Sequence, residues 1–283
     1  MKKICLAILI LSSSAFGKFD SPTMIYGEDN RTDTYKHSSS ILKSVAHSSA
    51  AMISSDKIRL VAGSAELRGK SIGEIYRLCK GSKFSHQPMI AECSGFLVAP
   101  DIIVTAGHCY QGSSCGDGRW VFDYKVEDSK QRNVTVSEND VYKCKEVIKQ
   151  SLTKESDFAV IRLDRKVEGR APLKIAKSQP KLGDKVAMVG HPSGLPQKIT
   201  DGGEVTAVSS YEFKASVDAF QINSGSAVVN ETTGEVLGIL VRGGRDYEYN
   251  EMEECSQTYV EPKVKKGKGE DVSSFGQFVR FIK

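Results

Sequence analysis

Short runs of apolar and β-branched residues, separated by turn residues, dominate the chain from residue 93 onward. Turn sequences rich in glycine and aspartate, such as Gly116-Asp117-Gly118 and Asp201-Gly202-Gly203, stand between the runs. Short strands at close spacing are typical of an all-β sandwich or barrel, so we predict an all-β fold with little helix. The predicted strands are 96–99, 102–106, 119–124, 141–148, 158–163, 184–190, 203–209, 226–230 and 235–242.

Helical spacing of apolar residues is confined to two short segments. Ser71 and Glu74 have the Ser-x-x-Glu pattern of a capping box, and apolar residues follow at helical spacing. Ser274 and Gln277 have the corresponding pattern before an apolar C-terminus. We therefore predict one short helix before residue 93 and a short C-terminal helix, the latter preceded by a solvated basic loop at Lys263–Lys268.

The most strongly patterned pair of runs lies within residues 93–109. Phe96–Ala99 and Ile102–Thr105 are apolar, and Pro100-Asp101 between them predicts a hairpin. The second strand ends on Ala106-Gly107-His108. The hairpin therefore delivers a single histidine to a sheet edge.

The first 17 residues have the three regions of a secretory leader. Met1-Lys2-Lys3 is basic, Ile4–Leu11 is almost wholly apolar, and Ala15-Phe16-Gly17 supplies small residues at the end. We predict a signal peptide at 1–17 and a secreted or periplasmic location after its removal. The apolar run is shorter than the roughly 20 residues of a membrane span, and no later segment approaches that length, so we expect no membrane anchor.

Composition narrows the class of partner. The chain has 283 residues and 40% hydrophobic residues, enough to bury a core in one large or two small domains. A net charge of +4 is too slight to indicate a nucleic-acid partner or an anionic membrane. The sequence has no phosphate-binding glycine loop and no Cys-x-x-Cys pair. We therefore expect no cofactor and no metal, and we expect a monomer.

Six cysteines remain once the leader, with Cys5, is removed. An even number in an exported chain favours disulfides over metal binding. Unpaired buried thiols are the alternative. The six are Cys79, Cys93, Cys109, Cys115, Cys144 and Cys255.

Three segments, in chain order, resemble the chymotrypsin-like (trypsin-like) serine proteases. Residues 93–109, with Cys-Ser-Gly-Phe-Leu-Val and then Thr-Ala-Gly-His-Cys, resemble the histidine region of that family. Glu155–Leu163 resembles its aspartate segment. Gln221–Ala227, with Asn-Ser-Gly-Ser, resembles the nucleophile loop of the glutamyl-endopeptidase-like (V8-like) bacterial branch. The order His, Asp, Ser is that of chymotrypsin. The resemblance spans roughly residues 25 to 262.

This resemblance implies two antiparallel six-stranded β-barrels with the active site in the cleft between them. The barrels would join near Gly169–Pro172. The expected organisation is a signal peptide at 1–17, a mature N-terminal segment or short propeptide at 18–35, a first barrel at 36–168, a second barrel at 169–262, and the basic loop with the C-terminal helix at 263–283.

The resemblance also assigns one disulfide, Cys93–Cys109. A loop of that length contributes roughly 3 kcal/mol in the chain-entropy model and would hold the backbone of His108 in place. The other four cysteines allow three connectivities. We favour Cys115–Cys144, because both flank the strand region around Trp120, which leaves Cys79–Cys255.

The implied activity is that of a serine endopeptidase acting on protein or peptide substrates. A serine hydroxyl is a poor nucleophile near neutral pH, so Ser224 needs a base. His108 has a suitable ordinary pKa, near 6.5, and Asp157 would orient it and stabilise the imidazolium. Taken singly, a strand-end acid or a serine beside glycine is usually a turn or loop residue. Their joint occurrence in family order favours the catalytic interpretation.

Two positions depart from the family pattern. The resemblance places the backbone N–H groups of Ile222 and Ser224 at the oxyanion hole, where the first position is normally glycine. A positive φ is costly for β-branched isoleucine, and a peptide turned away would remove one donor. The alternative is therefore a slow or inactive protease-like protein that binds peptides. Asn223 stands where trypsin-like zymogens carry an aspartate, so activation through an ion pair with a new N-terminal amine is not expected.

Substrate preference depends on three residues. Asp218, six residues before Ser224, stands where trypsin carries the acid at the base of its specificity pocket. We expect Asp218, Arg242 and Gly243 to line the pocket and Asp218 to select Lys or Arg through charge-assisted hydrogen bonds. Arg242 stands where trypsin-like enzymes usually have tryptophan, and it can fold back to neutralise Asp218.

Overall fold

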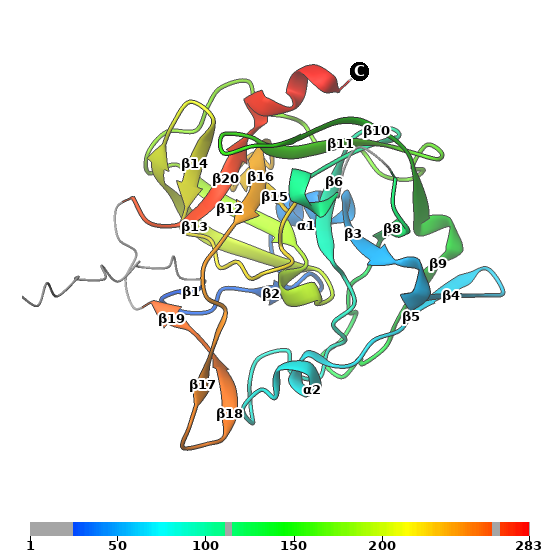
Figure 1. Cartoon of the computed structure of the whole chain (residues 1–283), viewed down its shortest axis with the longest axis vertical. Helices are drawn as coiled ribbons and strands as arrows, with labels where there is room; N and C mark the ends of the chain where they lie inside the picture. Colours follow the sequence, from blue (N-terminus) through cyan, green and yellow to red (C-terminus); the bar gives the residue numbers. More distant parts are fainter. Residues whose placement is uncertain (1–24, 111–114, 262–266, 283) are drawn as a thin grey trace, which may run out of the picture.

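Two closed antiparallel β-barrels lie side by side in the computed structural model, which describes residues 25–110, 115–261 and 267–282 (Figure 1). The two-barrel prediction is confirmed. The predicted signal peptide at 1–17 lies outside the described residues, as do residues 18–24 and 262–266. Among the residues described, no helix is both long and apolar enough to cross a lipid bilayer.

The first barrel closes in the strand order β10-β11-β7-β6-β3-β8. Its interior is filled by Leu97, Ile103, Trp120 and Ile161, all with no exposed surface. Burying side chains of this size contributes about 1.5–3 kcal/mol each. The strands are β3 (Ser49–Ser54), β6 (Cys93–Ala99), β7 (Ile102–Thr105), β8 (Gly118–Phe122), β10 (Val141–Leu152) and β11 (Asp157–Leu163).

The second barrel runs β12-β15-β16-β20-β14-β13 and closes through the pairing of β12 with β13. A short N-terminal strand, β2 (Thr32–Asp33), adds to the outside of β13. The strands are β12 (Lys185–Gly190), β13 (Lys198–Val208), β14 (Glu212–Ala215), β15 (Ala227–Asn230), β16 (Val236–Arg242) and β20 (Glu270–Ser274). Each of the predicted strands overlaps a strand of the two barrels.

Smaller elements surround the barrels. The predicted helix at Ser71 is present as α2 (Ile72–Tyr76) with its complete capping box, whereas α1 (Ser40–His47) was not predicted. The small sheets contain β4 (Ile58–Val61), β5 (Ser64–Leu67) and β9 (Val134–Ser137), the hairpin of β17 (Tyr247–Asn250) and β18 (Cys255–Thr258), and the parallel pair β1 (Ile25–Tyr26) and β19 (Val260–Glu261).

The C-terminus differs from the predicted helix. Only two 3-10 turns, Phe275–Gln277 and Val279–Phe281, follow β20. Ser274 does not cap them, because its hydroxyl donates to Gln179 Oε1 at 2.7 Å, and Gly276 within the first turn disfavours a continued α-helix. Within the predicted segment 263–283, the described residues Glu270–Ser274 form β20, a strand of the second barrel, and the start of the predicted basic loop, 263–266, lies outside the described residues.

All three expected disulfides are present. Cys93–Cys109 joins the ends of the β6–β7 hairpin, and Cys115–Cys144 lies beside β8 and β10. Cys79–Cys255 spans 176 positions of sequence and ties the α2 segment to the β17–β18 hairpin. The favoured pairing is confirmed.

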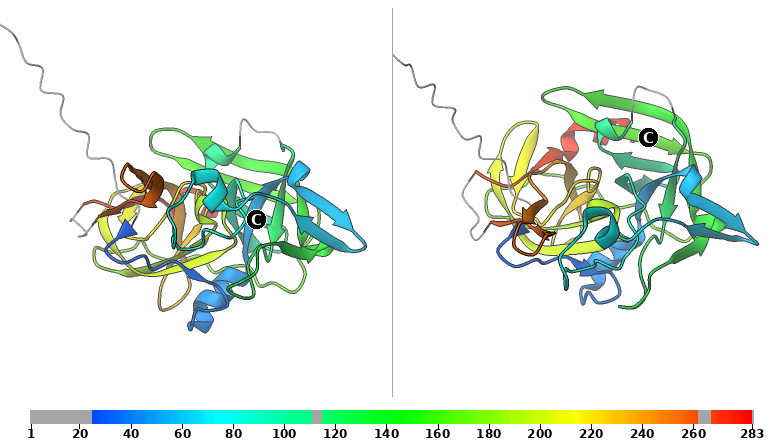
Figure 2. Two further views of the ribbon diagram at one scale, coloured as in Figure 1. Left: turned by 90° about the horizontal axis from the view of Figure 1, so that it is seen from below. Right: turned by 60° about the horizontal axis from the view of Figure 1, so that its bottom comes forward.

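A shared apolar layer joins the two barrels. Phe96 and Phe158 of the first barrel pack in one cluster with Val189 and Ile239 of the second. Phe278 from the C-terminal turns fills the same layer, with its ring centroid 6.4 Å from that of Phe96. Figure 2 shows the barrels side by side from two further directions. The relative position of residues in the two barrels is therefore fixed by packing.

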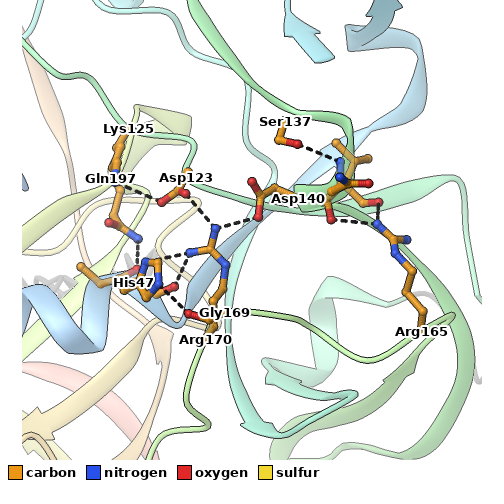
Figure 3. Close-up of polar contacts among 12 residues, drawn as sticks. His47, Asp123, Lys125, Ser137, Asp140, Arg165, Gly169, Arg170 and Gln197 are labelled. Carbon is orange, nitrogen blue, oxygen red and sulfur yellow. Dashed lines mark hydrogen bonds and ion pairs between the residues drawn. The ribbon is translucent and has the colours of Figure 1, made fainter. Parts of the chain in front are cut away.

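The connector between the barrels is held by a buried arginine. Arg170 donates to Asp123 and Asp140, each at 2.7 Å, and to the backbone carbonyl of His47 at 2.6 Å (Figure 3). Its side chain is only 4% exposed. Gln197 from the second barrel donates to the carbonyl of Ala46 beside it. Charge-assisted hydrogen bonds in a buried setting are stronger than neutral ones, so this network restrains the connector.

Candidate active site

His108 and Asp157 lie in direct contact at the edge of the first barrel. The Asp157 carboxylate accepts from His108 Nδ1 at 2.9 Å and from the His108 backbone N–H at 3.1 Å. Asp157 is buried, with its side chain 5% exposed, whereas the His108 side chain is 36% exposed. With Nδ1 bound to the acid, the other ring nitrogen, Nε2, is left to face a reacting group.

Adjacent strands create this contact. β7 pairs with β11 so that Thr105 lies opposite Ala159, which places the end of β7 beside Asp157 at the start of β11. His108 lies in the short turn Gly107–Cys109 just beyond β7. A Cβ at Gly107 would lie 2.2 Å from the carbonyl oxygen of Ser151, so glycine is required for this close approach.

Ser224 belongs to a loop of the second barrel that packs against β6 of the first. Its carbonyl oxygen accepts from the N–H of Ser94 at 2.8 Å and lies 3.8 Å from Sγ of Cys109. Gly225 follows with a φ of +90°, and a Cβ there would lie 1.9 Å from the carbonyl oxygen of Ser94. Ser224, the candidate nucleophile, therefore lies beside Cys109, the residue that follows His108 in the sequence.

The structure joins His108 to Asp157 by hydrogen bonds, but not to Ser224. Across residues 25–110, 115–261 and 267–282, no hydrogen bond connects the His108 ring with the Ser224 hydroxyl. Catalytic hydrogen bonds are often long in ligand-free enzymes and shorten when substrate binds.

Ile222 adopts the backbone conformation that glycine usually provides. Its φ is +72°. The carbonyl of Gln221 accepts from the N–H of Ser193 at 2.7 Å. In a trans peptide the carbonyl and the following N–H point in opposite directions, so the N–H of Ile222 points away from Ser193. In the described part of the chain, neither Ile222 N–H nor Ser224 N–H donates a hydrogen bond, which leaves both available to an oxyanion.

Asp218 contacts the N-terminal segment. Its two carboxylate oxygens accept from the N–H of Tyr26 at 2.9 Å and the N–H of Asn30 at 2.7 Å. The residue is 2% exposed, and burial raises the pKa of Asp218 to about 6, against the lowering effect of the two N–H groups. A carboxylate occupied in this way holds the N-terminal segment against the second barrel.

Arg242 and Gly243, the other residues predicted for the pocket, are exposed at the end of β16. The Arg242 guanidinium pairs with Asp271 at 3.3 Å and with Glu212 at 3.2 Å. It therefore does not fold back onto Asp218.

Sequence reasoning missed the contacts that hold Gln221, the residue before Ile222. Its N–H donates to the Asp246 carboxylate, at 3.2 Å to Oδ2, and its side-chain amide donates to the hydroxyl of Tyr76 at 2.5 Å. Asp246 lies 25 positions and Tyr76 145 positions from Gln221 in sequence. No sequence pattern connects them.

Metal binding has no support in the described part of the chain. Among those residues, one group has the proximity that a metal site requires, formed by Cys79, Glu253 and Cys255. Both cysteines are consumed by their disulfide, so no thiolate is free to bind a cation.

Comparison with known proteins agrees with this architecture. The family model for the trypsin-like peptidase domain matches residues 93–239, just over half of the chain. No curated protein matches the sequence.

Solved structures resemble the chain at low sequence identity. A Glu endopeptidase in complex with MPD is 17% identical, covers 91% of this chain and 97% of its own, and has a TM-score of 0.53. The active form of the Rv3671c protease from M. tuberculosis is 14% identical, with 98% and 93% coverage and a TM-score of 0.50. The two barrels and the family match together show that the chain belongs to the trypsin-like peptidase family of serine-type endopeptidases.

Proposed function

We propose that the protein hydrolyses peptide bonds with Ser224 as nucleophile, His108 as general base and acid, and Asp157 as the group that orients His108. The observation that carries the proposal is the double hydrogen bond from His108 to a buried Asp157. This contact fixes the tautomer with the proton on Nδ1, so Nε2 is an acceptor.

The reaction follows from these roles. As the Ser224 oxygen forms a bond to the substrate carbonyl carbon, its proton passes to Nε2 of His108. The carbonyl oxygen becomes an anion that the N–H groups of Ile222 and Ser224 stabilise. His108 then protonates the leaving amine as the carbon–nitrogen bond breaks. Water hydrolyses the acyl-enzyme by the same steps, which regenerates Ser224.

The contacts of Asp218 argue against its use as a selector of basic side chains. A Lys or Arg side chain would have to compete with two backbone donors already bound to a buried carboxylate. A similar structure is that of a Glu endopeptidase, so cleavage after Glu is the alternative, but the histidine that this branch uses in its pocket is not matched at the strand where Leu240 and Val241 stand. The predicted Lys/Arg preference and the glutamate alternative are therefore both put to the experiment below.

A peptide-binding protein without activity is the second candidate. Its sequence support is Ile222 at the oxyanion hole. The positive φ of Ile222 and the direction of the Gln221 carbonyl weaken that support, because they match an intact pair of donors. We therefore prefer the enzyme.

The proposal includes export of the chain from the cytoplasm. Three disulfides persist in an oxidising compartment, and the N-terminal sequence has the regions of a signal peptide. We propose that the mature chain acts on protein or peptide substrates in the periplasm or outside the cell.

Cleavage of a mixed peptide library, with products sequenced by mass spectrometry, tests the proposal. The wild-type chain should cleave internal peptide bonds, and Ser224→Ala should not. Enrichment of Lys or Arg before the cleaved bond would support the basic preference, and enrichment of Glu would replace it. Binding of peptides without cleavage would favour the second candidate.

A further inference from the structure

The β17–β18 hairpin is attached to the α2 segment on the side of the molecule that carries the nucleophile loop. Cys79–Cys255 links the two covalently. Backbone hydrogen bonds reinforce the link, from Cys79 N–H to the Ser256 carbonyl and from Ser256 N–H to the Arg77 carbonyl, both at 2.9 Å. Figure 1 shows the hairpin and α2 next to each other, projecting below the barrels. The disulfide and these hydrogen bonds therefore fix the position of the hairpin relative to α2.

Three residues from different segments hold Gln221. Asp246, just before β17, accepts from the Gln221 backbone N–H at 3.2 and 3.3 Å, one distance to each carboxylate oxygen. Ser193 N–H donates to the Gln221 carbonyl, and the Tyr76 hydroxyl accepts from the Gln221 side chain. Both peptide groups that flank the Gln221 Cα are thus restrained by residues distant in sequence.

An aromatic shell covers these polar contacts. The Tyr247 ring stacks on Tyr76 with centroids 4.8 Å apart and lies 5.4 Å from the ring of Phe220. The Tyr247 hydroxyl contacts Oγ of Ser193 at 3.1 Å. Asp246 is only 7% exposed beneath them. A hydrogen bond accepted by a buried carboxylate is stronger than the same bond in water.

Ile222 explains why restraint is needed here. A β-branched residue in the left-handed region is strained, and such conformations persist only where surrounding contacts determine them. Without restraint at Gln221, rotation of the Gln221–Ile222 peptide would relieve the strain. That rotation would turn the Ile222 N–H away from the developing oxyanion.

We propose that Asp246 is a positioning residue for the reaction. Its carboxylate binds the N–H of the Phe220–Gln221 peptide and so fixes the Cα of Gln221, from which the next peptide, Gln221–Ile222, bound at its carbonyl by Ser193 N–H, presents Ile222 N–H to the oxyanion. This inference rests on the proposed function. In this role Asp246 holds the nucleophile loop in position and does not contact the substrate.

The charge on Asp246 gives the contact a pH dependence. Burial raises the pKa of Asp246 to about 7, while the Gln221 N–H and the buried guanidinium of Arg31 act in the opposite direction. Tyr76, Tyr247 and Glu270 are the other titratable groups that interact with Asp246. As pH rises through about 7, the acceptor becomes a full carboxylate, so the restraint on Gln221 strengthens.

Three variants of the full chain test the inference: Asp246→Ala, which removes the acceptor, Asp246→Asn, which keeps one carbonyl oxygen, and Glu251→Gln, a matched change at the exposed hairpin tip. Loss of one oxyanion donor costs about 10²- to 10³-fold in kcat, so partial misorientation in Asp246→Ala should cost roughly 10- to 100-fold with KM changed less than about threefold. Asp246→Asn should have a kcat much closer to wild type than Asp246→Ala has. It should also lack the increase in activity near pH 7 that ionisation of Asp246 causes in the wild-type chain. Glu251→Gln should match wild type.

Hydrogen exchange of the peptide covering 218–226 gives a readout independent of turnover. It should quicken in Asp246→Ala and stay near wild type in Asp246→Asn. Unchanged kcat and unchanged exchange in Asp246→Ala would overturn the inference, as would a loss confined to KM. If the wild-type chain cleaves peptides and Ser224→Ala does not, normal turnover and normal exchange in Asp246→Ala overturn this inference alone. A wild-type chain without activity overturns it together with the proposed function.

Discussion

The His108–Asp157 pair and the Gln221–Ser224 loop are held in place in different ways. The pair is fixed by neighbours: two adjacent strands, β7 and β11, and a disulfide between positions 93 and 109 that closes a short loop. The loop is fixed by groups from other loops of the chain, among them Asp246, just before β17, and Ser193 after β12. One half of the candidate site is thus held within the sheet of one barrel, although its two residues are 49 positions apart in sequence, whereas the other half depends on contacts from separate loops.

This difference predicts where the site tolerates change. A substitution in the His108–Asp157 pair removes a chemical group, so its effect should fall on the reaction with little effect on folding. A substitution around the Gln221–Ser224 loop removes a contact that holds the loop in place. Its effect should therefore be smaller and should appear in both turnover and stability. The predictions below test this division, beginning with the largest effect.

Replacing His108 with Ala should lower kcat by about 10⁶-fold, because the base is absent, and replacing Asp157 with Asn should lower it by about 10⁴-fold, because His108 is held in the wrong tautomer. Initial rates on a peptide substrate measure the effect. Glu155→Gln, an exposed carboxylate two residues before Asp157, is the matched control and should keep wild-type rates. Rates of Asp157→Asn within tenfold of wild type would contradict the assigned role of Asp157.

Replacing Asp218 with Asn should act on stability. Both oxygens of the carboxyl can accept from the Tyr26 and Asn30 N–H groups whether or not it is protonated, whereas the amide nitrogen of Asn cannot accept, and leaving a buried donor unpaired costs roughly 1–3 kcal/mol. Because the folded-state pKa of Asp218 is raised from 3.8 to about 6, the folded chain holds this proton more tightly than the unfolded chain. The wild-type advantage should therefore be largest below pH 3.8 and diminish as pH rises through about 6.

Thermal unfolding of wild type and Asp218→Asn between pH 3.5 and 7.5, a range of about 4 units chosen to span the titration, measures this trend. Asp117→Asn, an exposed change, should show no such trend. An advantage that grows with pH would contradict the account, as would a large loss of cleavage after Lys or Arg in Asp218→Asn with unchanged stability.

Replacing Ile222 with Gly should have the smallest effect on turnover. The backbone already has the positive φ that glycine allows, so kcat should stay within about threefold of wild type. Ile222→Ala, which keeps a Cβ at the same φ, separates lost packing from relieved strain. A rise in kcat of tenfold or more in the glycine variant alone would mean that Ile222 limits the oxyanion hole.

Much of the fold could be predicted because its strands are strongly apolar. β7, with Ile-Ile-Val-Thr, and β11, with Asp-Phe-Ala-Val-Ile-Arg-Leu, have no competing interpretation. β3 contains small residues and β20 has one large apolar side chain, Val272, so neither shows a strand pattern on its own. Pairing with neighbours in the barrels gives these segments their structure, and a single sequence does not contain that information.

The candidate site divides in the same way. The motifs around His108, Asp157 and Ser224 predict the contact of His108 with Asp157, which lies within one barrel. The same motifs assign Asp218 to the base of the specificity pocket, which stays a prediction, and nothing near residue 218 reveals that the backbone of Tyr26 and Asn30 binds its carboxylate. The sequence places Asp246 in an acidic loop that follows the cleft strand, but its contact with Gln221 was missed, because that partner is 25 positions away in another loop.

The most direct test of the shared role of His108, Asp157 and Ser224 is covalent labelling with a fluorophosphonate, followed by digestion and mass spectrometry. The reagent forms a phosphorus–oxygen bond with an activated serine and releases fluoride. The account predicts an adduct on Ser224 in the wild-type chain, its absence in Ser224→Ala and much slower labelling in His108→Ala. An unlabelled wild-type chain, or labelling that persists in Ser224→Ala, would contradict it.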